Sequence, residues 1–217
     1  MINFDEMIDN YLFRKFRPKG VGRYYPSEAG MCLRKVWYTY KYPKETEPEL
    51  LKIFEMGNIL HNFVVEVLKS EKNPDVELVE SELPVKIQMD DFLVSGRIDD
   101  VIIVKSSGKT FLVEVKSCKS LNYIKEPQHH HIMQIQLYMR ATGIHNGILL
   151  YIQKNDLQSK IFNIPYDKEI AESALERFSA LHKYLTEDKL PPQEARNDSE
   201  MSWMCTYCEY KDRCEGE

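Results

Sequence analysis

The sequence predicts a mixed α/β fold in a single domain, and two features of its hydrophobic pattern support that prediction. Apolar residues recur every three or four positions in the first third of the 217-residue chain, which is the spacing of amphipathic helices. Residue types that favour strands then dominate, followed by a helix, two more strands and a last helix. Strands interleaved with helices in this way are typical of a sheet covered by helices. No Gly/Ser-rich linker divides the chain, so one domain is expected.

The helices are predicted from this spacing and from signals at their ends. Ser27 is a good N-cap residue, so a helix that carries Cys32 through Trp37 is expected to begin there. The Pro18-Lys19-Gly20 run ends the helix before it, and Pro127 opens a later one. The helices are expected, in chain order, over residues 4–16, 27–37, 49–69, 127–142 and 167–186.

The strands are predicted over residues 76–89, 92–104, 110–116, 147–153 and 159–165. Pro84 is expected to interrupt the first strand, because proline has no N–H group to donate. A Ser-Ser-Gly-Lys run at 106–109 is a natural hairpin loop, so the second and third strands should pair in antiparallel. These boundaries give a helical N-terminal region (1–70), a core (76–188) and a cysteine-bearing tail (189–217) that is expected to be a loop.

The composition, with 43% apolar and 29% charged residues, excludes a disordered or collagen-like chain. No run of 18 apolar residues is present to span a membrane, and the acidic start of the chain is unlike a signal peptide. We therefore expect a soluble cytoplasmic protein without a membrane partner.

Positive charge is concentrated near the N-terminus, although the whole chain carries a net charge of −5. Residues 14–44 hold nine basic side chains and one acid, interleaved with seven aromatic residues. Cations pair with phosphates and rings stack on unpaired bases, so this stretch fits single-stranded DNA. A solvated basic face with ordinary core aromatics explains the pattern equally well. The residues expected to contact DNA are Arg14, Lys15, Arg17, Arg23, Tyr24, Arg34 and Lys35.

Three of the five cysteines, Cys205, Cys208 and Cys214, lie within ten residues of a hydrophilic tail. Such a tail cannot bury three thiols as small hydrophobic residues, so a metal is predicted. A coordination sphere of four thiolates needs one more sulfur, from Cys32 or Cys118. Zinc and a 4Fe-4S cluster both accept four thiolates, so the number of ligands leaves both open.

Acidic and basic residues are predicted to meet on one face of two paired strands. Strand alternation places Glu114 and Lys116 on the same face, and the hairpin brings Asp99 or Asp100 of the preceding strand close to Glu114. Two carboxylates beside a lysine fit a Mg²⁺ or Mn²⁺ site in which the lysine positions a water. An ordinary surface acid pair with a Glu–Lys contact is the alternative.

These residues belong to a longer ordered pattern that resembles the RecB-like branch of the PD-(D/E)XK nuclease superfamily. The shared motifs are Gly-x-x-x-His at 57–61, Gly-x-x-Asp at 96–99, Glu-x-Lys at 114–116 and Gln-x-x-x-Tyr at 134–138. With Cys32 and the Cys-x2-Cys-x5-Cys tail added, the chain is similar to the iron-sulfur Cas-four family of CRISPR-associated exonucleases. The spacing from Gly96 in this pattern favours Asp99 over Asp100.

The resemblance implies a restriction-endonuclease-like mixed sheet flanked by helices, with an iron-sulfur cluster that staples the N-terminal helical region to the tail. It implies a metal-dependent exonuclease that acts on single-stranded DNA ends and trims or selects new CRISPR spacers alongside the integrase complex. It assigns a Mn²⁺ or Mg²⁺ ion to His61, Asp99, Glu114 and the Val115 carbonyl, the attacking water to Lys116, and the phosphate or DNA to Gln134 and Tyr138. It assigns a 4Fe-4S cluster to Cys32, Cys205, Cys208 and Cys214, which leaves Cys118 as a buried spare.

Several alternatives remain open. His61 could be a core histidine, and Gln134 and Tyr138 could close the interface between helix and sheet. The histidines at 129–131 point in different directions on a helix, so they are expected to face solvent or DNA rather than to bind zinc. A stand-alone RecB-like nuclease of recombination, repair or a mobile element and a non-catalytic DNA-binding cluster protein are the alternative functions. Assembly into a homo-oligomer is left open.

Overall fold

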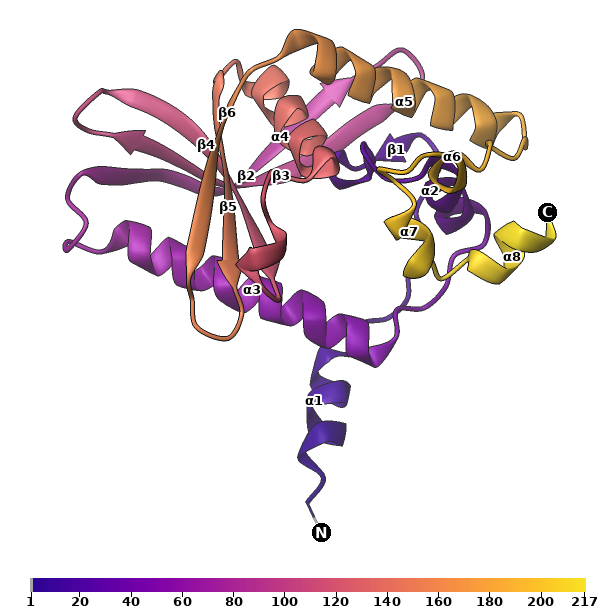
Figure 1. Ribbon diagram of the computed structural model, residues 1–217, viewed down its shortest axis with the longest axis horizontal. Helices are drawn as coiled ribbons and strands as arrows, with labels where there is room; N and C mark the ends of the chain where they lie inside the picture. The colour runs from indigo at the N-terminus through magenta and orange to yellow at the C-terminus, as the bar shows by residue number, and fades with distance from the viewer. Residues whose placement is uncertain (1) are drawn as a thin grey trace.

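The computed structural model describes residues 2–217 and has a six-stranded mixed sheet at its centre (Figure 1). The strands are β1 (Arg23–Tyr24), β2 (Val76–Gln88), β3 (Leu93–Val104), β4 (Lys109–Cys118), β5 (Asn146–Gln153) and β6 (Ser159–Pro165). β2 runs along one edge of β3, while β1 and β4 share the other edge. β5 and β6 follow beyond β4.

The helices are α1 (Phe4–Leu12), α2 (Leu33–Lys41), α3 (Pro48–Lys69), α4 (His129–Thr142), α5 (Lys168–Thr186), α6 (Glu194–Asn197), α7 (Trp203–Thr206) and α8 (Lys211–Gly216). Two short 3₁₀ turns, η1 (Pro26–Glu28) and η2 (Leu121–Tyr123), complete the elements. None of the helices formed by residues 2–217 is both long and apolar enough to cross a membrane.

The sheet combines antiparallel and parallel pairs, as the sequence predicts. β2, β3 and β4 form an antiparallel meander, and β5 pairs with β6 in antiparallel. β4 and β5 are parallel, so the chain must cross over between them, and α4 makes that crossover. The crossover brings α4 next to the strand that carries the predicted acid and lysine.

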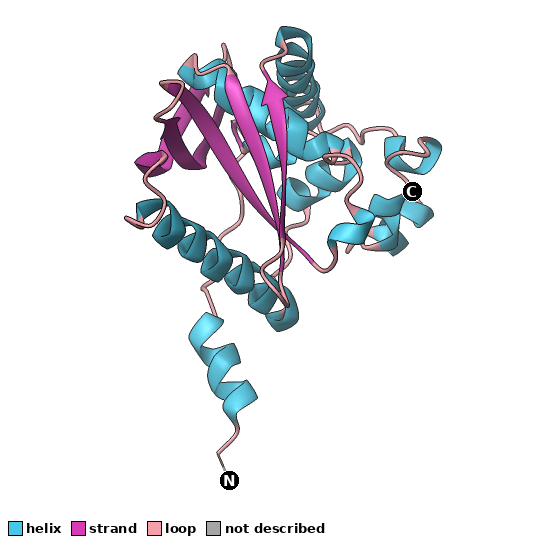
Figure 2. Ribbon diagram, turned by 60° about the vertical axis from the view of Figure 1, so that its left-hand side comes forward, coloured by secondary structure: helices cyan, strands magenta, loops and turns pink. Residues whose placement is uncertain are grey.

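Helices cover both faces of the sheet (Figures 1 and 2). On one face, Leu60 and Val64 of α3 pack with Ile152 of β5. On the opposite face, Ile135 of α4 packs with Leu112 of β4, and α5 packs against α4. α1 contacts α3 and extends away from the rest of the molecule (Figure 1).

β3 and β4 separate at the centre of the sheet. Their recorded backbone pairing runs from Val104 opposite Lys109 to Asp100 opposite Val113. One residue earlier, the Asp99 side chain accepts a hydrogen bond from the Val115 N–H at 2.7 Å. The Asp99 carboxylate thus satisfies the Val115 N–H group, which no longer pairs with the backbone of β3. The opening between the two strands is where the predicted acids lie.

The structure corrects several predicted boundaries. The first helix ends at Leu12, and no single helix runs from Ser27, because α2 begins only at Leu33. A Cβ atom at Gly30 would lie 2.4 Å from the backbone of His130, so the chain here passes tightly against α4. β2 is not interrupted at Pro84, because β2 is an edge strand that can leave one position without a donor. The tail forms three short helices rather than a loop.

Candidate active site

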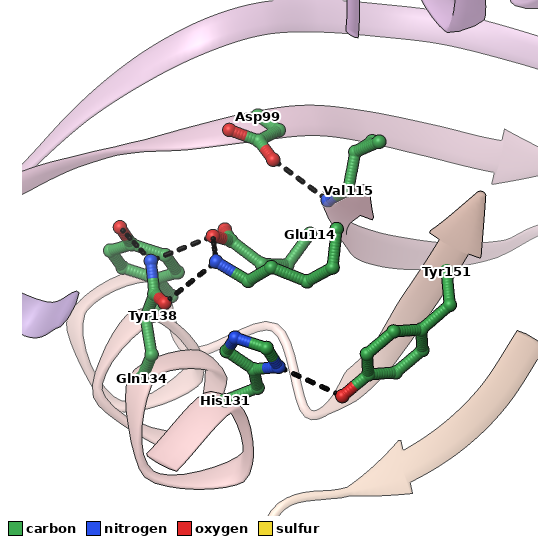
Figure 3. A network of polar contacts seen from close by, with 8 residues as sticks. Asp99, Glu114, Val115, His131, Gln134, Tyr138 and Tyr151 are labelled. Atoms are coloured by element: carbon green, nitrogen blue, oxygen red, sulfur yellow. Dashed lines mark hydrogen bonds and ion pairs between the residues drawn. The ribbon is translucent and has the colours of Figure 1, made fainter. Parts of the chain in front are cut away.

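Glu114, Lys116 and Gln134 form a hydrogen-bonded network between β4 and α4 (Figure 3). The Lys116 Nζ donates to Glu114 Oε1 at 2.7 Å and to Gln134 Oε1 at 3.0 Å. The Gln134 Nε2 donates to Glu114 Oε1 at 2.7 Å and to Tyr138 Oη at 3.1 Å. Gln134 and Tyr138 meet because they are four residues apart on one helix face. The predicted shared face of Glu114 and Lys116 is confirmed.

Asp99, rather than Asp100, lies on the side of Glu114. Asp100 pairs with Val113 across the ladder, so alternation turns Asp99 to the face of Glu114. Burial and, after it, the nearby charge of Glu114 raise the pKa of the Asp99 carboxyl to about 7, against the opposing effects of the Val115 N–H, Lys116 and His61. The two carboxylates therefore share a poorly hydrated site in which one negative charge disfavours the other.

His61 of α3 faces a second set of carboxylates. Its Nε2 lies 3.3 Å from Asp100 Oδ2, and its Nδ1 lies 3.6 Å from Glu82 Oε1. The Asp100 carboxylate raises the pKa of His61 to about 9, with Asp99 and Glu82 adding to the effect against burial. Ligand atoms of His61, Glu82 and Asp99 lie within 4.8 Å of one another, a group that does not include Glu114. Of the three side chains predicted to hold one ion, His61 and Asp99 thus belong to one group, and Glu114 lies outside it.

Glu82 was not singled out by the sequence. β2 carries several exposed acids, including Glu77, Glu80 and Glu82, and strand alternation does not distinguish Glu80 from Glu82. Glu82 reaches the site because of its backbone conformation and because α3 packs beside it. Both are features of the folded chain that the sequence does not show.

The polar atoms of this region fit a divalent cation. Within residues 2–217, His61 Nε2, both Asp100 carboxylate oxygens and Glu114 Oε2 are buried without a hydrogen-bond partner. A buried carboxylate oxygen without a partner costs free energy, which a cation beside it offsets. Carboxylates, backbone carbonyls and imidazole are also the donors that Mg²⁺ and Mn²⁺ accept. The donor set therefore matches a hard divalent ion.

Four of the five cysteines line a single cavity. Cys32 lies at the N-cap of α2, and the others lie in the tail, on or beside α7 and α8: Cys205, Cys208 and Cys214. Burial raises the pKa of the Cys205 and Cys208 thiols, and the neighbouring cysteines Cys32 and Cys214 raise it further. Cys118 lies elsewhere, half-buried against the core between the sheet and α4.

Arg177 of α5 joins the two ends of the chain beside this cavity. Its guanidinium donates to the carbonyls of Ala29 and Met31 at 2.8 Å each, and to the Glu194 carboxylate at 2.7 and 3.1 Å. Glu194 also accepts a hydrogen bond from the Leu33 N–H. Arg177 therefore links the segment that carries Cys32 to the start of the tail, and it is not alone in doing so.

The seven residues expected to contact DNA do not form one surface. The expectation is wrong for Tyr24, which is fully buried and stacks on Phe178, so its ring cannot reach a base. It is also wrong for Arg34, which is buried and donates to the Pro191 carbonyl at 2.6 Å. Lys35 is half-buried at the cysteine cavity, and the exposed Arg23 donates to Ser95.

Three of the predicted DNA contacts do share a groove. Arg14, Lys15 and Arg17 are exposed and line it. Lys19 and Lys44 add positive charge, and three phenylalanines line the same groove: Phe13, Phe16 and Phe54. The aromatic residues of α2 instead belong to the core, as the alternative interpretation had it.

Two members of the histidine run are half-buried and make contacts within the protein. His131 Nδ1 lies 2.8 Å from Tyr151 Oη, and burial lowers the pKa of His131 to about 2. The His130 ring packs against Trp203, and burial lowers its pKa to about 4. Tertiary packing of α4 against the sheet and the tail explains both. His129 is exposed.

Comparison with known proteins identifies the family. Residues 32–215 match the model of the PD-(D/E)XK nuclease superfamily. The chain belongs to this superfamily, which confirms the predicted mixed sheet flanked by helices and supports nuclease activity that depends on divalent metal ions.

More specific relatives agree with this assignment. The chain is 28% identical over 194 residues to the CRISPR-associated exonuclease Cas4 of Saccharolobus solfataricus (strain ATCC 35092 / DSM 1617 / JCM 11322 / P2), covering 88% of this chain and 86% of the relative. The resemblance noted in the motifs is thereby confirmed as a similarity along most of the chain.

Two solved structures share the fold. The crystal structure of SSO0001 has a TM-score of 0.62 and 23% identity, with 94% of this chain and 90% of that chain covered. A phage-related exonuclease from Haemophilus somnus 129PT has a TM-score of 0.54 and 13% identity, with 82% of this chain and 96% of that chain covered.

Proposed function

We propose that the chain is a metal-dependent DNA exonuclease that degrades single-stranded DNA from its ends. The observation that carries this proposal is the buried site at the opening between β3 and β4, where Asp99, Glu114 and Lys116 converge. A binding protein has no need of two repelling buried carboxylates beside a lysine, whereas hydrolysis of a phosphodiester does.

The residues of this site have separate roles. His61, Asp99, Glu114 and the Val115 carbonyl are the proposed ligands of a divalent ion, which would supply charge neutralisation at the phosphate and lower the pKa of a water. Lys116 lies beside the ligands, at 2.7 Å from Glu114, so its ammonium can hold the attacking water and offset developing negative charge. Gln134 fixes the position of both groups, and Tyr138 in turn receives a hydrogen bond from Gln134.

A single strand is the substrate that the surface supports best. The groove lined by Arg14, Lys15 and Arg17 offers cations for phosphates, and its phenylalanines offer rings on which unpaired bases can stack. The similarity to a CRISPR-associated exonuclease supports a role in spacer acquisition, with the integrase complex as partner. A RecB-like nuclease outside CRISPR adaptation would use the same site, and the genomic neighbourhood of the gene distinguishes the two.

The cysteine cavity is the proposed site of a 4Fe-4S cluster. The four thiolates around one mononuclear zinc ion lie about 3.8 Å apart, since each Zn–S bond is about 2.3 Å. Among the described cysteines no three sulfurs come within 4.8 Å of one another, which suits the larger cluster better than a single ion. The cluster would join the segment at Cys32 to the tail and would take no part in hydrolysis.

End-labelled DNA tests the function directly. Single-stranded oligonucleotides labelled at the 5′ or the 3′ end are incubated with the protein and Mn²⁺ or Mg²⁺, and double-stranded DNA is run in parallel. We expect stepwise shortening of the single strands that stops when EDTA is added. Absence of metal-dependent cleavage under all these conditions, with DNA binding retained, would identify a non-catalytic DNA-binding protein instead.

A further inference from the structure

His131 lies beside the candidate active site, but the roles assigned above do not include it. It precedes Gln134 by three residues on α4, and Tyr138 follows four residues later, so the three side chains share one helix face. Figure 3 shows this face, with the ring of His131 on the side of Glu114. His131 thus extends the polar face of the Gln-x-x-x-Tyr motif by one helical turn.

Tyr151 holds the ring of His131 in place. It pairs with Lys116 across the parallel strands β4 and β5, so the two side chains lie on the same face of the sheet. The Tyr151 Oη lies 2.8 Å from His131 Nδ1 and accepts a hydrogen bond from the Gln128 N–H at 3.1 Å. Burial raises the pKa of the Tyr151 phenol, so the hydroxyl keeps its proton. That proton is donated to His131 Nδ1, the acceptor within reach.

This contact decides which nitrogen of His131 carries a hydrogen. Burial lowers the pKa of His131 to about 2, so the imidazole is neutral and has a single N–H group. Because Nδ1 accepts the Tyr151 proton, the hydrogen of the ring is on Nε2. Nε2 makes no hydrogen bond within residues 2–217, yet it is not fully buried, so water or a ligand can reach it. His131 therefore presents an unused N–H donor.

Lys116 provides a second unused donor beside it. The Lys116 Nζ has three protons, of which Glu114 and Gln134 accept two. Lys116 is close enough to His131 for its charge to contribute to the lowered pKa of the ring. An ammonium and a neutral N–H group are both donors without an acceptor, so a ligand that contacts both must supply oxygens with lone pairs. A phosphate does so, and its negative charge strengthens both hydrogen bonds.

We propose that His131 donates a hydrogen bond from Nε2 to an oxygen of the DNA phosphate that is cleaved, and that Tyr151 positions the ring for this contact. The proposal rests on the proposed nuclease function, because the cleaved phosphate is the anion that the site receives. His131 holds this phosphate without exchanging a proton. A fixed donor aimed at an oxygen that gains negative charge stabilises the transition state.

A polar contact that only closes the interface between α4 and the sheet is the competing explanation. Tyr151 belongs to the core, and its buried hydroxyl needs a partner there. Packing depends on His131 Nδ1, whereas the proposed contact depends on the N–H group at Nε2. Both His131→Gln and His131→Phe remove the imidazole. The Gln amide can place an N–H group near the position of Nε2, and Phe keeps a ring without any donor, so this pair separates the two explanations.

Cleavage of end-labelled single strands with Mg²⁺ tests the contact, at a temperature below the melting point of every variant. We expect His131→Phe to lower the rate at saturating DNA by about 10- to 100-fold, which corresponds to a lost hydrogen bond to a charged group. The DNA concentration at half-maximal rate should change little. His131→Gln should recover most of the rate. His145→Phe is the matched control, because His145 is an exposed histidine beside a tyrosine, Tyr166, and it should keep the wild-type rate.

Nuclear magnetic resonance of the His131 ring tests the proposal without any cleavage. The full-length, isotope-labelled protein is measured with Mg²⁺ before and after addition of thymidine 5′-monophosphate, which has a phosphate but no phosphodiester. We expect the Nε2–H tautomer in the free protein and a shift of the His131 signal when the nucleotide is added, with the signal of His145 unchanged. Tyr151→Phe should allow both tautomers, because it removes the proton that Nδ1 accepts.

The possible results separate this inference from the nuclease proposal. An Nδ1–H tautomer in the wild type, a His131 signal that the nucleotide leaves in place, or equal rates in His131→Phe and His131→Gln would each overturn the contact. Loss of one limb of the pH–rate profile in His131→Gln would also do so, because a neutral donor takes up no proton. A shift of His131 in a protein that cleaves no DNA would support the contact and contradict the nuclease function.

Discussion

The oxygen-donor site and the cysteine cavity are assembled in opposite ways. The carboxylates of the first lie on adjacent strands, and hydrogen bonds from Lys116, Gln134 and the Val115 N–H already hold Glu114 and Asp99. The thiols of the second come from the two ends of the chain. Hydrogen bonds of Arg177, Arg34, Tyr38, Lys44 and Tyr210 also join those ends. Burial and the neighbouring cysteines raise the pKa of the Cys205 and Cys208 thiols, so their thiolates need a cation beside them. We infer that the oxygen site folds without its ion, whereas the cysteine cavity gains stability from its ligand.

The largest expected effect concerns the oxygen-donor site and tests whether Glu114 takes part in catalysis. Glu114→Gln removes a charge while keeping the shape of the side chain, so the fold should persist. Cleavage of end-labelled single strands should fall by about 10³-fold or more, because a divalent ion contributes several kcal/mol of transition-state stabilisation. DNA binding by fluorescence anisotropy and the melting temperature should change little. Cleavage within tenfold of the wild type would show that Glu114 is not a ligand.

The second prediction concerns the cysteine cavity and tests whether its ligand stabilises the fold. Cys208→Ser should abolish the yellow-brown colour and the visible absorption of the purified protein. It should also lower the free energy of unfolding by at least about 3 kcal/mol, part of the roughly 10 kcal/mol that structural metal sites contribute. Cys118→Ser is the matched control, since Cys118 is equally half-buried but lies outside the cavity, and it should keep iron, sulfide and colour. A colourless wild type with one zinc ion per chain would contradict the cluster.

The difference between the two regions also explains what the sequence could predict. Local rules were sufficient for the oxygen site: alternation along 111–116 placed Glu114 with Lys116, and helix periodicity placed Gln134 with Tyr138. The ends of the elements were predicted within a few residues, except where Gly30 passes α4 and in the tail, where three short helices replace the predicted loop.

Tertiary packing determines the features that the sequence did not predict. Tyr24 and Arg34 look like DNA contacts in a basic stretch, yet one is buried against Phe178 and the other against the tail. In the sequence, Glu82 resembles the other acids of β2. In the structure, its left-handed backbone, with a φ angle of 57°, and the packing of α3 bring it to His61. Residue type and spacing do not encode such contacts between distant segments, so these residues were either wrongly assigned or missed.

Arg177 offers a third test, because it joins the chain ends without any metal. Arg177→Ala leaves the Ala29 and Met31 carbonyls and the Glu194 carboxylate without their donor. We expect a loss of about 2–4 kcal/mol in the free energy of unfolding and faster loss of the cluster in EDTA, with nuclease activity retained below the melting temperature. Lys168→Ala, on an exposed residue of the same helix, should change neither. An unchanged stability would mean that the other contacts between the ends, such as those of Arg34 and Tyr38, are sufficient.

The smallest expected effect concerns the groove at Arg14, Lys15 and Arg17, which belongs to neither site. Replacing all three by Gln should weaken binding of single-stranded DNA by about tenfold at low salt. Each phosphate neutralised by a cation contributes about 0.7 to the slope of log K against log salt on a single strand, so that slope should become shallower by about 2. The cleavage rate at saturating DNA and the visible absorption should stay the same, because the groove supplies no ligand. If the slope is unchanged, the DNA reaches Glu114 along another surface, and the groove must be assigned a different role.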